Sequence, residues 1–154
     1  MKITLLAVGR IKRGPERELI DDYLKRARKL GGGLGVRAVQ EIEVEAGGQQ
    51  TAEADALLAK IPDGAHVILF DETGKDHTSI SFSASMEKLK DQGCPHLVFM
   101  IGGADGYTDE MKSRFPEKIC LGSLTWPHKL VRVLASEQIY RALSLMAGTP
   151  YHRE

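Results

Sequence analysis

Residues 121–154 read LGSLTWPHKLVRVLASEQIYRALSLMAGTPYHRE, and the rest of the chain is organised as a scaffold for this stretch. It joins a loop of Gly, Ser and Thr, a Trp-Pro-His corner, a long apolar segment and a tail with Tyr151, His152 and Arg153. A loop of small residues can hold a ligand through its backbone, whereas a chain terminus ordinarily frays. The stretch therefore indicates a binding loop, a helix and a tail whose polar side chains belong to a functional site.

The composition indicates one globular domain over residues 1–154. The chain is 42% hydrophobic, which is enough for a normal core. Lysine plus arginine equal aspartate plus glutamate at 21 each, so no overall positive field draws the protein to nucleic acid or to a membrane. Cys94 and Cys120 lack the spacing of a disulfide framework or a metal site, and we expect no metal. The apolar run Ile3–Val8 is too short for a signal peptide or a membrane span, so we expect a cytoplasmic protein.

Apolar runs alternate with helical patterns along the whole chain. Apolar runs predict strands at 2–8, 36–44, 66–70, 96–101 and 118–121. Apolar residues at helical spacing, with capping residues and glycine stops, predict helices at 15–31, 51–61, 79–93, 108–115 and 130–147. This alternation is typical of an α/β fold, in which a parallel sheet is flanked by helices.

Polar and glycine-rich segments follow three of the predicted strands. They are DETGK at 71–75, GGADG at 102–106 and GSLTWPH at 122–128. Ligands of open α/β sheets bind at the carboxyl ends of the strands, so these segments are candidate edges of one site. The glycines do not form GxGxxG after the first strand, which argues against a classical dinucleotide fold. Segment 46–50 is either a plain loop or a mobile flap.

The predicted last helix is apolar around most of its circumference. Its polar residues form a narrow stripe of Arg132, Ser136, Glu137, Arg141 and Ser144. Such a helix buries one face on the sheet and another on a second partner, so we expect a homodimer. Arg132 and Arg141 either bind phosphate or pair with Glu137. The basic end of the first helix, residues 25–29, either touches RNA or is a solvated face.

Five motifs combine into a family resemblance. They are MKITLLAVG at 1–9, FDETGK at 70–75, IGGADG at 101–106, LTWPHKLVRVLASEQIYRA at 124–142 and PYHRE at 150–154, and the last two are the most specific. Together they make the chain similar, over nearly its full length, to the ribosomal RNA large subunit methyltransferase H (RlmH) family of the SPOUT superfamily. The resemblance implies an α/β fold with a C-terminal deep trefoil knot, in which S-adenosylmethionine lies bent among three loops.

The resemblance also implies a site and a reaction. The cofactor contacts map to Phe70, Gly103, Gly122, Ser123, Leu124, Thr125, Trp126 and Pro127. The family more often has leucine at position 70 and a small or apolar residue at position 126. The implied reaction methylates N3 of a pseudouridine in 23S rRNA within the assembled 70S ribosome. A protein that docks on a whole ribosome can use shape and a few local cations, in keeping with the neutral net charge.

Methyl transfer requires alignment of donor and acceptor, exclusion of water and loss of the N3 proton. In the tail, His152 is a candidate to accept or relay this proton, Arg153 to hold a phosphate or a base carbonyl, and Tyr151 to stack or hydrogen-bond. His128 either contacts the substrate or caps a backbone carbonyl. Trp126 either lines the adenosine pocket or plugs the dimer or knot core. In the family's dimers, the tail of one subunit borders the cofactor pocket of the other.

Two rival functions come from other classes. A non-catalytic ribosome- or RNA-binding dimeric module would keep the basic helix end but would not need the glycine loops or the histidine tail. A nucleotide-dependent oxidoreductase would need the glycine fingerprint after the first strand, where Val8-Gly9-Arg10 supplies one glycine.

Overall fold

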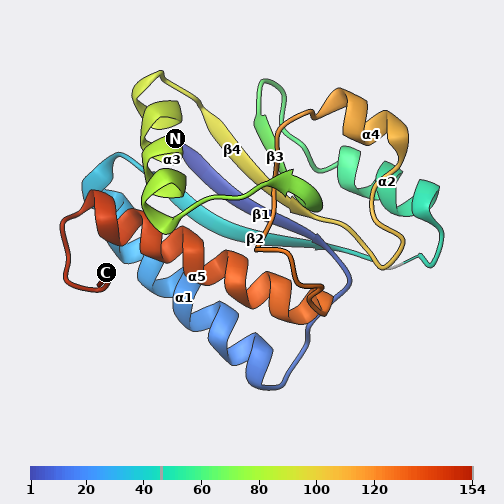
Figure 1. The fold of residues 1–154 in the computed structure, drawn as a ribbon, viewed down its shortest axis with the longest axis horizontal. Coiled ribbons are helices and arrows are strands. Elements are labelled where there is room, and N and C mark those ends of the chain that lie inside the picture. The colour runs from blue at the N-terminus through green and yellow to red at the C-terminus, as the bar shows by residue number, and fades with distance from the viewer. Residues whose placement is uncertain (46, 154) are drawn as a thin grey trace.

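A parallel five-stranded sheet runs through the centre of the protein, with helices on both faces (Figure 1). The structure, a computed structural model, describes residues 1–45 and 47–153; Ala46, the first residue of the 46–50 segment, and Glu154 lie outside the described residues. The strand order is β2-β1-β4-β3-β5. In chain order the elements are β1 (Lys2–Val8), α1 (Pro15–Gly31), η1 (Gly32–Leu34), β2 (Ala38–Val44), α2 (Gln50–Leu58), β3 (His66–Lys75), α3 (Ser79–Asp91), β4 (His96–Ile101), α4 (Asp109–Arg114), β5 (Lys118–Ile119) and α5 (His128–Met146). The predicted parallel α/β class is confirmed.

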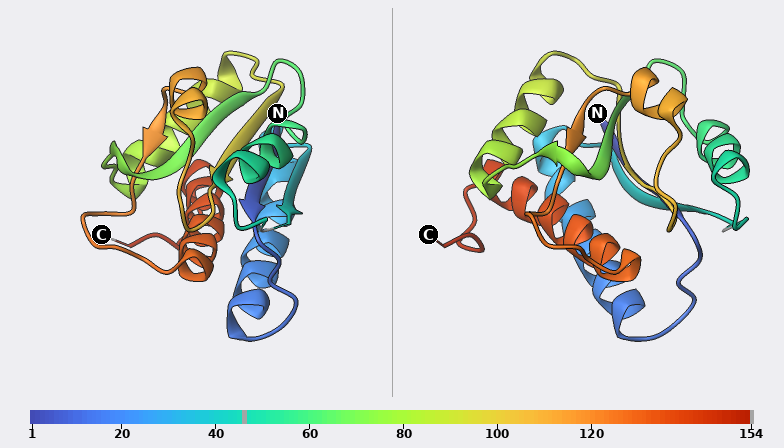
Figure 2. Two further views of the ribbon diagram at one scale, coloured as in Figure 1. Left: turned by 90° about the vertical axis from the view of Figure 1, so that its right-hand side faces the viewer. Right: turned by 45° about the vertical axis from the view of Figure 1, so that its right-hand side comes forward.

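The core has two layers, one on each face of the sheet. Helices α1, α3 and α5 bury their apolar sides against one face, around Leu5 and Phe99. Helices α2 and α4 cover the other face, around Leu69 and Met100 (Figure 2). The central strands β1 and β4 are buried on both sides, as their unbroken apolar sequences predict.

Several predicted boundaries need correction. The predicted loop 71–75 belongs to β3, because Lys75 pairs with Ile119 after an irregularity that follows Phe70. β5 is shorter than predicted. Thr51 is not a helix cap, since α2 begins one residue earlier without a side-chain cap. The cap predicted for α4 is confirmed, because the Thr108 hydroxyl accepts a hydrogen bond from the backbone N–H of Met111.

Three of the five residues in the polar stripe of α5 are buried. Arg132 is 3% exposed, and Ser136 and Ser144 are fully buried. The Arg132 guanidinium donates to Glu41 and Glu43 on β2 and to the carbonyl oxygens of Val8 and Gly9 after β1. Arg132 therefore fastens α5 to the sheet through Glu41 and Glu43 instead of pairing with Glu137, whereas Ser136 donates to the carbonyl oxygen of Arg132 within the helix.

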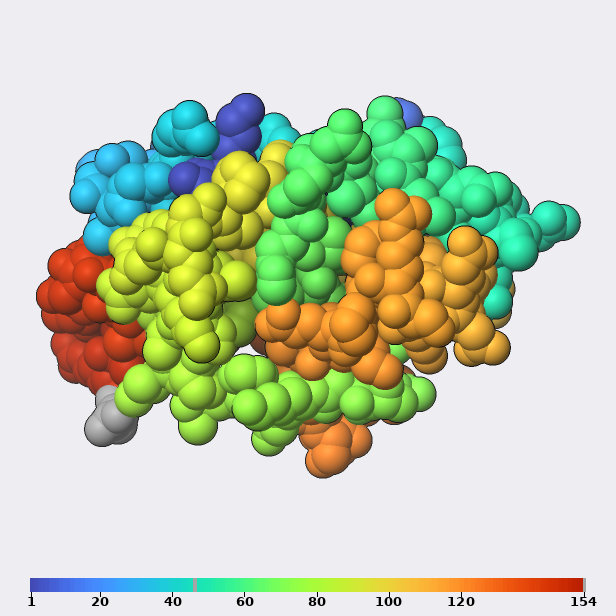
Figure 3. All heavy atoms as spheres, turned by 90° about the horizontal axis from the view of Figure 1, so that it is seen from above, coloured from blue at the N-terminus to red at the C-terminus, as the bar shows by residue number. Residues whose placement is uncertain are grey.

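Strand β3 and the segment after α4 cross at very short range. Leu69 and Phe70 pair with β5, the chain then bulges outward, and Lys75 returns to pair with Ile119 and to accept a hydrogen bond from Cys120 N–H at 3.0 Å. A Cβ atom placed on Gly74 would lie 2.5–2.7 Å from the backbone of Ile119. Figure 3 shows the two segments in contact, with β3 in green and the later segment in orange. Glycine is therefore required at this crossing.

We predict that Gly74→Ala lowers the free energy of unfolding by about 1–3 kcal/mol, because one of the two backbones must move to accept the methyl group. Gly33→Ala is the matched control, since its Cβ would meet no atom within 4 Å. Urea unfolding of both variants measures the difference. Equal stability of the two variants would contradict the close crossing.

Candidate functional site

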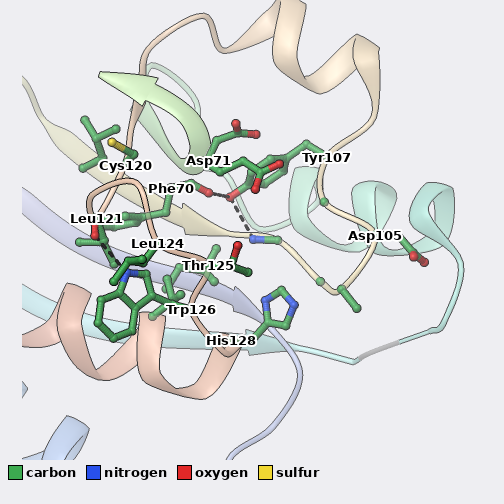
Figure 4. Close-up of a pocket in the computed structure, with 18 of the residues that line it drawn as sticks. Phe70, Asp71, Asp105, Tyr107, Cys120, Leu121, Leu124, Thr125, Trp126 and His128 are labelled. Atoms are coloured by element: carbon green, nitrogen blue, oxygen red, sulfur yellow. Dashed lines mark hydrogen bonds between the residues drawn. The ribbon is translucent and has the colours of Figure 1, made fainter. Parts of the chain in front are cut away.

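A cavity of about 370 Å³ opens at the carboxyl ends of β3, β4 and β5. This volume lies within the range of about 300–1,000 Å³ that is typical of small-molecule sites. Three segments build the wall: the end of β3, the glycine loop after β4, and the segment between β5 and α5 (Figure 4). The lining residues are Phe70–Glu72, Ile101–Tyr107, Lys112, Ile119–Gly122, Leu124–Trp126, His128 and Val131.

Tyr107 fixes the glycine loop to two strand ends. Its hydroxyl donates to the carbonyl oxygen of Met100 at 2.6 Å, lies 3.2 Å from the carbonyl oxygen of Phe70, and accepts from Gly102 N–H at 2.9 Å (Figure 4). Burial raises the pKa of Tyr107, so the hydroxyl stays protonated. Sequence reasoning missed this residue, although an aromatic side chain directly after GGADG was a usable signal.

Helix α2 supports the glycine loop from behind. Gln50 donates through Nε2 to the carbonyl oxygens of Asp105 and Tyr107. The buried carboxylate of Glu53 lies so close to Gly103 that any side chain at position 103 would collide with it. Gly103 thus leaves room for the Glu53 side chain of α2 against the loop, while its own backbone lines the cavity.

The segment before α5 forms the outer wall and is held by few contacts. Trp126 donates through Nε1 to the carbonyl oxygen of Leu121 at 3.0 Å and is 38% exposed, while Leu124 is 72% exposed. Of the predicted cofactor residues, the cavity is lined by Phe70, Gly103, Gly122, Leu124, Thr125 and Trp126. Ser123 and Pro127 lie in the same exposed segment but outside the lining. Trp126 faces the cavity instead of plugging a core.

Charged side chains stand at the rim. Asp71 lies 3.5 Å from Lys112 and accepts hydrogen bonds from the backbone and hydroxyl of Thr73. Burial favours a higher pKa, but the Thr73 hydrogen bonds and the Lys112 cation hold the pKa of Asp71 below its ordinary value. Asp71 is therefore ionised at neutral pH and lies beside the Lys112 side chain. His128, the first residue of α5, completes this wall.

A second cavity of about 270 Å³ adjoins the first. The two share Phe70, residues 119–122 and Trp126. Its remaining wall comes from the start of α3 and from Leu134 and Gln138 of α5. Trp126 thus contributes to the walls of both cavities. The second cavity lies along the side of α5 that carries Leu134 and Gln138.

The predicted catalytic tail lies elsewhere in this chain. Tyr151 donates to Oε1 of Glu137 at 3.0 Å and packs against the ring of Tyr140 at a centroid distance of 4.6 Å. Arg141 binds the same carboxylate and lies over the Tyr151 ring. Glu137 is nine residues from His128, about 14 Å along the helix axis. The tail thus folds back beside the C-terminal end of its own α5 (Figure 1), and its residues are not part of the cavity lining.

Hydrogen bonds hold the side chains of the tail in place. Arg141 can only donate, so Nδ1 of His152, 3.2 Å from Arg141 Nη1, is the acceptor of this hydrogen bond, while Nε2 is buried. Burial raises the pKa of Tyr151, and the Glu137 carboxylate adds to the effect. In this arrangement the Tyr151 hydroxyl is committed to Glu137, and Nε2 of His152 is buried. Arg153 is exposed.

Neither a metal centre nor a membrane helix emerges from residues 1–45 and 47–153. In these ranges His, Cys, Asp and Glu do not gather into a group of three that could bind a metal ion. The helices there are also too short or too polar to cross a bilayer.

Comparison with known proteins gives a consistent family assignment. The family model described as "Predicted SPOUT methyltransferase" matches residues 1–152. The ribosomal RNA large subunit methyltransferase H of Hyphomonas neptunium is 45% identical over 153 residues, 99% of each chain. The protein of that name from Dinoroseobacter shibae is 45% identical over 155 residues, again 99% of each chain. A methyltransferase of Legionella pneumophila solved with SAM is 14% identical, with a TM-score of 0.45 over 95% of this chain and 66% of that one. The chain belongs to the ribosomal RNA large subunit methyltransferase H family of SPOUT methyltransferases.

Proposed function

We propose that the protein transfers a methyl group from S-adenosylmethionine to N3 of a pseudouridine in 23S rRNA of the assembled 70S ribosome. The observation that carries the proposal is the cavity of about 370 Å³ enclosed by the three segments whose motifs mark the family. The whole chain, residues 1–154, acts as one domain.

The residues of the cavity fit the cofactor. Gly103 and Gly122 leave backbone exposed to a ligand, and Phe70, Leu124 and Trp126 supply apolar walls for an adenine ring. Asp71, Asp105 and Lys112 at the rim can bind hydroxyl, ammonium and carboxylate groups. S-adenosylmethionine, when bound, supplies an electrophilic methyl group on a sulfonium sulfur.

The protein's own task is to orient the base and to help N3 lose its proton. Removal of that proton places negative charge on the two carbonyl oxygens beside N3, and hydrogen-bond donors aimed at them stabilise it. The exposed Arg153 is a donor of this kind, and the Tyr151 hydroxyl and Nε2 of His152 act in the same way once Tyr151 leaves Glu137 and His152 leaves its buried position. His128, in the cavity wall, is the candidate to take up the N3 proton.

A homodimer brings these donors to a cavity. The tail of a chain lies beyond its own cavity, and α5 exposes Leu130 and half-exposes Leu134 on its outer face. Together with Leu124 and Trp126 they form an apolar surface next to the second cavity. A second copy seated there covers this surface and places its tail at the cavity of the first. The close crossing at Gly74 and Ile119 supports a knotted C-terminal segment.

Two tyrosine variants separate the cofactor site from the tail. We predict that Tyr107→Phe weakens S-adenosylmethionine binding about tenfold or more, because Gly102 N–H and Met100 C=O lose their partner and the glycine loop loosens. Tyr151→Phe removes the same atom from the tail, so cofactor affinity stays normal while methylation of ribosomes falls. Calorimetric titration and a tritium-transfer assay measure the two effects. Absence of S-adenosylmethionine binding by the unaltered protein would refute the methyltransferase assignment.

Mixed dimers test whether the site is shared between chains. A chain lacking residues 151–154 and a chain whose cavity is filled by Thr125→Trp should each be inactive alone. After subunit exchange, random pairing gives about a quarter of the wild-type activity, because half of the dimers hold one complete site of two. The mixture is assayed against each variant alone. A mixture as inactive as its components would show that the tail serves its own chain.

A further inference from the structure

We propose that the loop between β1 and α1, residues 9–14, docks the phosphate backbone of the RNA that carries the target base. The inference rests on the proposed function and names the surface beside the cavity that the substrate uses. Its sequence, GRIKRG, places three cations within four residues of a chain that is neutral overall. Binding of a polyanion by such a chain depends on where its cations gather.

The fold puts this loop at the edge of the sheet that holds the cavity. β1 pairs in parallel with β4, and Ala7 lies opposite Ile101, so the loop after β1 starts beside the glycine loop after β4. Arg132 joins α5 to the start of the loop through the carbonyl oxygens of Val8 and Gly9, at 2.9 and 2.8 Å. His128 in the cavity wall is one helical turn before Arg132, about 6 Å along the axis. Figure 4 shows β1 ending beside His128.

The loop is anchored by one residue and presents its neighbours to solvent. Ile11 is 4% exposed, and its backbone N–H donates to Oε1 of Glu43 at 3.0 Å. Arg10, Lys12 and Arg13 on either side are exposed. A cation on an anchored loop loses less conformational freedom on binding than one on a free segment. The loop therefore holds its charges in a set position relative to the cavity.

Most of the positive charge of the loop is free to bind phosphate. Arg10 pairs with Glu45 at 2.8 Å, but both side chains are more than half exposed and the pair exchanges readily with phosphate. Among the described residues no carboxylate forms an ion pair with Lys12 or Arg13. Lys129, exposed next to His128, adds a cation at the start of α5. The nearby acidic residues Glu16 and Glu18 sit in the first turn of α1, where the helix dipole favours them.

The basic end of α1 is a weaker candidate. Arg26 pairs with Asp22 at 2.9 Å and lies over the ring of Tyr140, and Arg28 donates to the carbonyl oxygen of Val39 at 2.7 Å. Arg26 and Arg28, two of the four cations at this end of α1, are thus engaged in contacts within the protein. The remaining exposed pair, Lys25 and Lys29, lies at the far end of α1 from the loop.

The test compares two double variants that remove the same charge. In Lys12→Ala/Arg13→Ala we expect ribosome affinity, measured by co-sedimentation at about 0.1 M salt, to fall roughly tenfold. The slope of log K against log salt concentration should drop by about one for each phosphate that the variant no longer neutralises. KM for ribosomes rises in parallel, while the dissociation constant for S-adenosylmethionine and kcat stay unchanged. Lys25→Ala/Lys29→Ala, the matched control, should leave all of these quantities unchanged.

The outcomes separate this inference from the proposed function. Equal loss of affinity in both double variants would show an effect of net charge alone, and no loss in the loop variant would show that the RNA docks elsewhere; either result overturns the inference. Both are read from ribosome binding and need no methylation. Failure of the unaltered protein to bind S-adenosylmethionine would instead overturn the proposed function.

Discussion

The buried guanidinium of Arg132 holds the arrangement together. A buried cation is stable only when carboxylates and other acceptors surround it, and here two glutamates of β2 and two carbonyl oxygens after β1 do so. Arg17 of α1 binds the same two glutamates. Three segments that are distant in sequence, α1, the β1–β2 edge and α5, therefore meet at one charged cluster. The position of His128, and with it one wall of the cavity, follows from this attachment.

The protein separates two kinds of recognition. The cavity is shaped largely by backbone, since glycines and strand ends form its floor and a neutral tyrosine hydroxyl fixes the glycine loop. The tail offers only side chains, and their orientation comes from one carboxylate, Glu137, which binds Tyr151 and Arg141. Backbone recognition suits a cofactor of constant shape. Under the proposed function, side chains on a short tail suit a base that arrives as part of a much larger particle.

The sequence predicted the parts of the structure that depend on local patterns. The buried strands, the Thr108 cap and the apolar α5 follow from periodicity and from the hydrogen bonds that capping residues make. Features that depend on distant partners were not predictable in this way. Arg132 reads as a surface cation until Glu41 and Glu43 are placed beside it. The extension of β3 through residues 71–75 depends on a second pairing with Ile119, which no local pattern reveals.

The candidate site also contains parts that the sequence predicted and parts that only the fold reveals. Family motifs located the glycine loop and the segment before α5, but Tyr107 and Lys112 enter the site only through the fold. Trp126 is the single tryptophan of the chain and forms a wall of both cavities. Its indole is therefore a built-in optical reporter: a ligand that enters either hollow changes the polarity around one fluorophore, and the emission of the unlabelled protein follows occupancy directly.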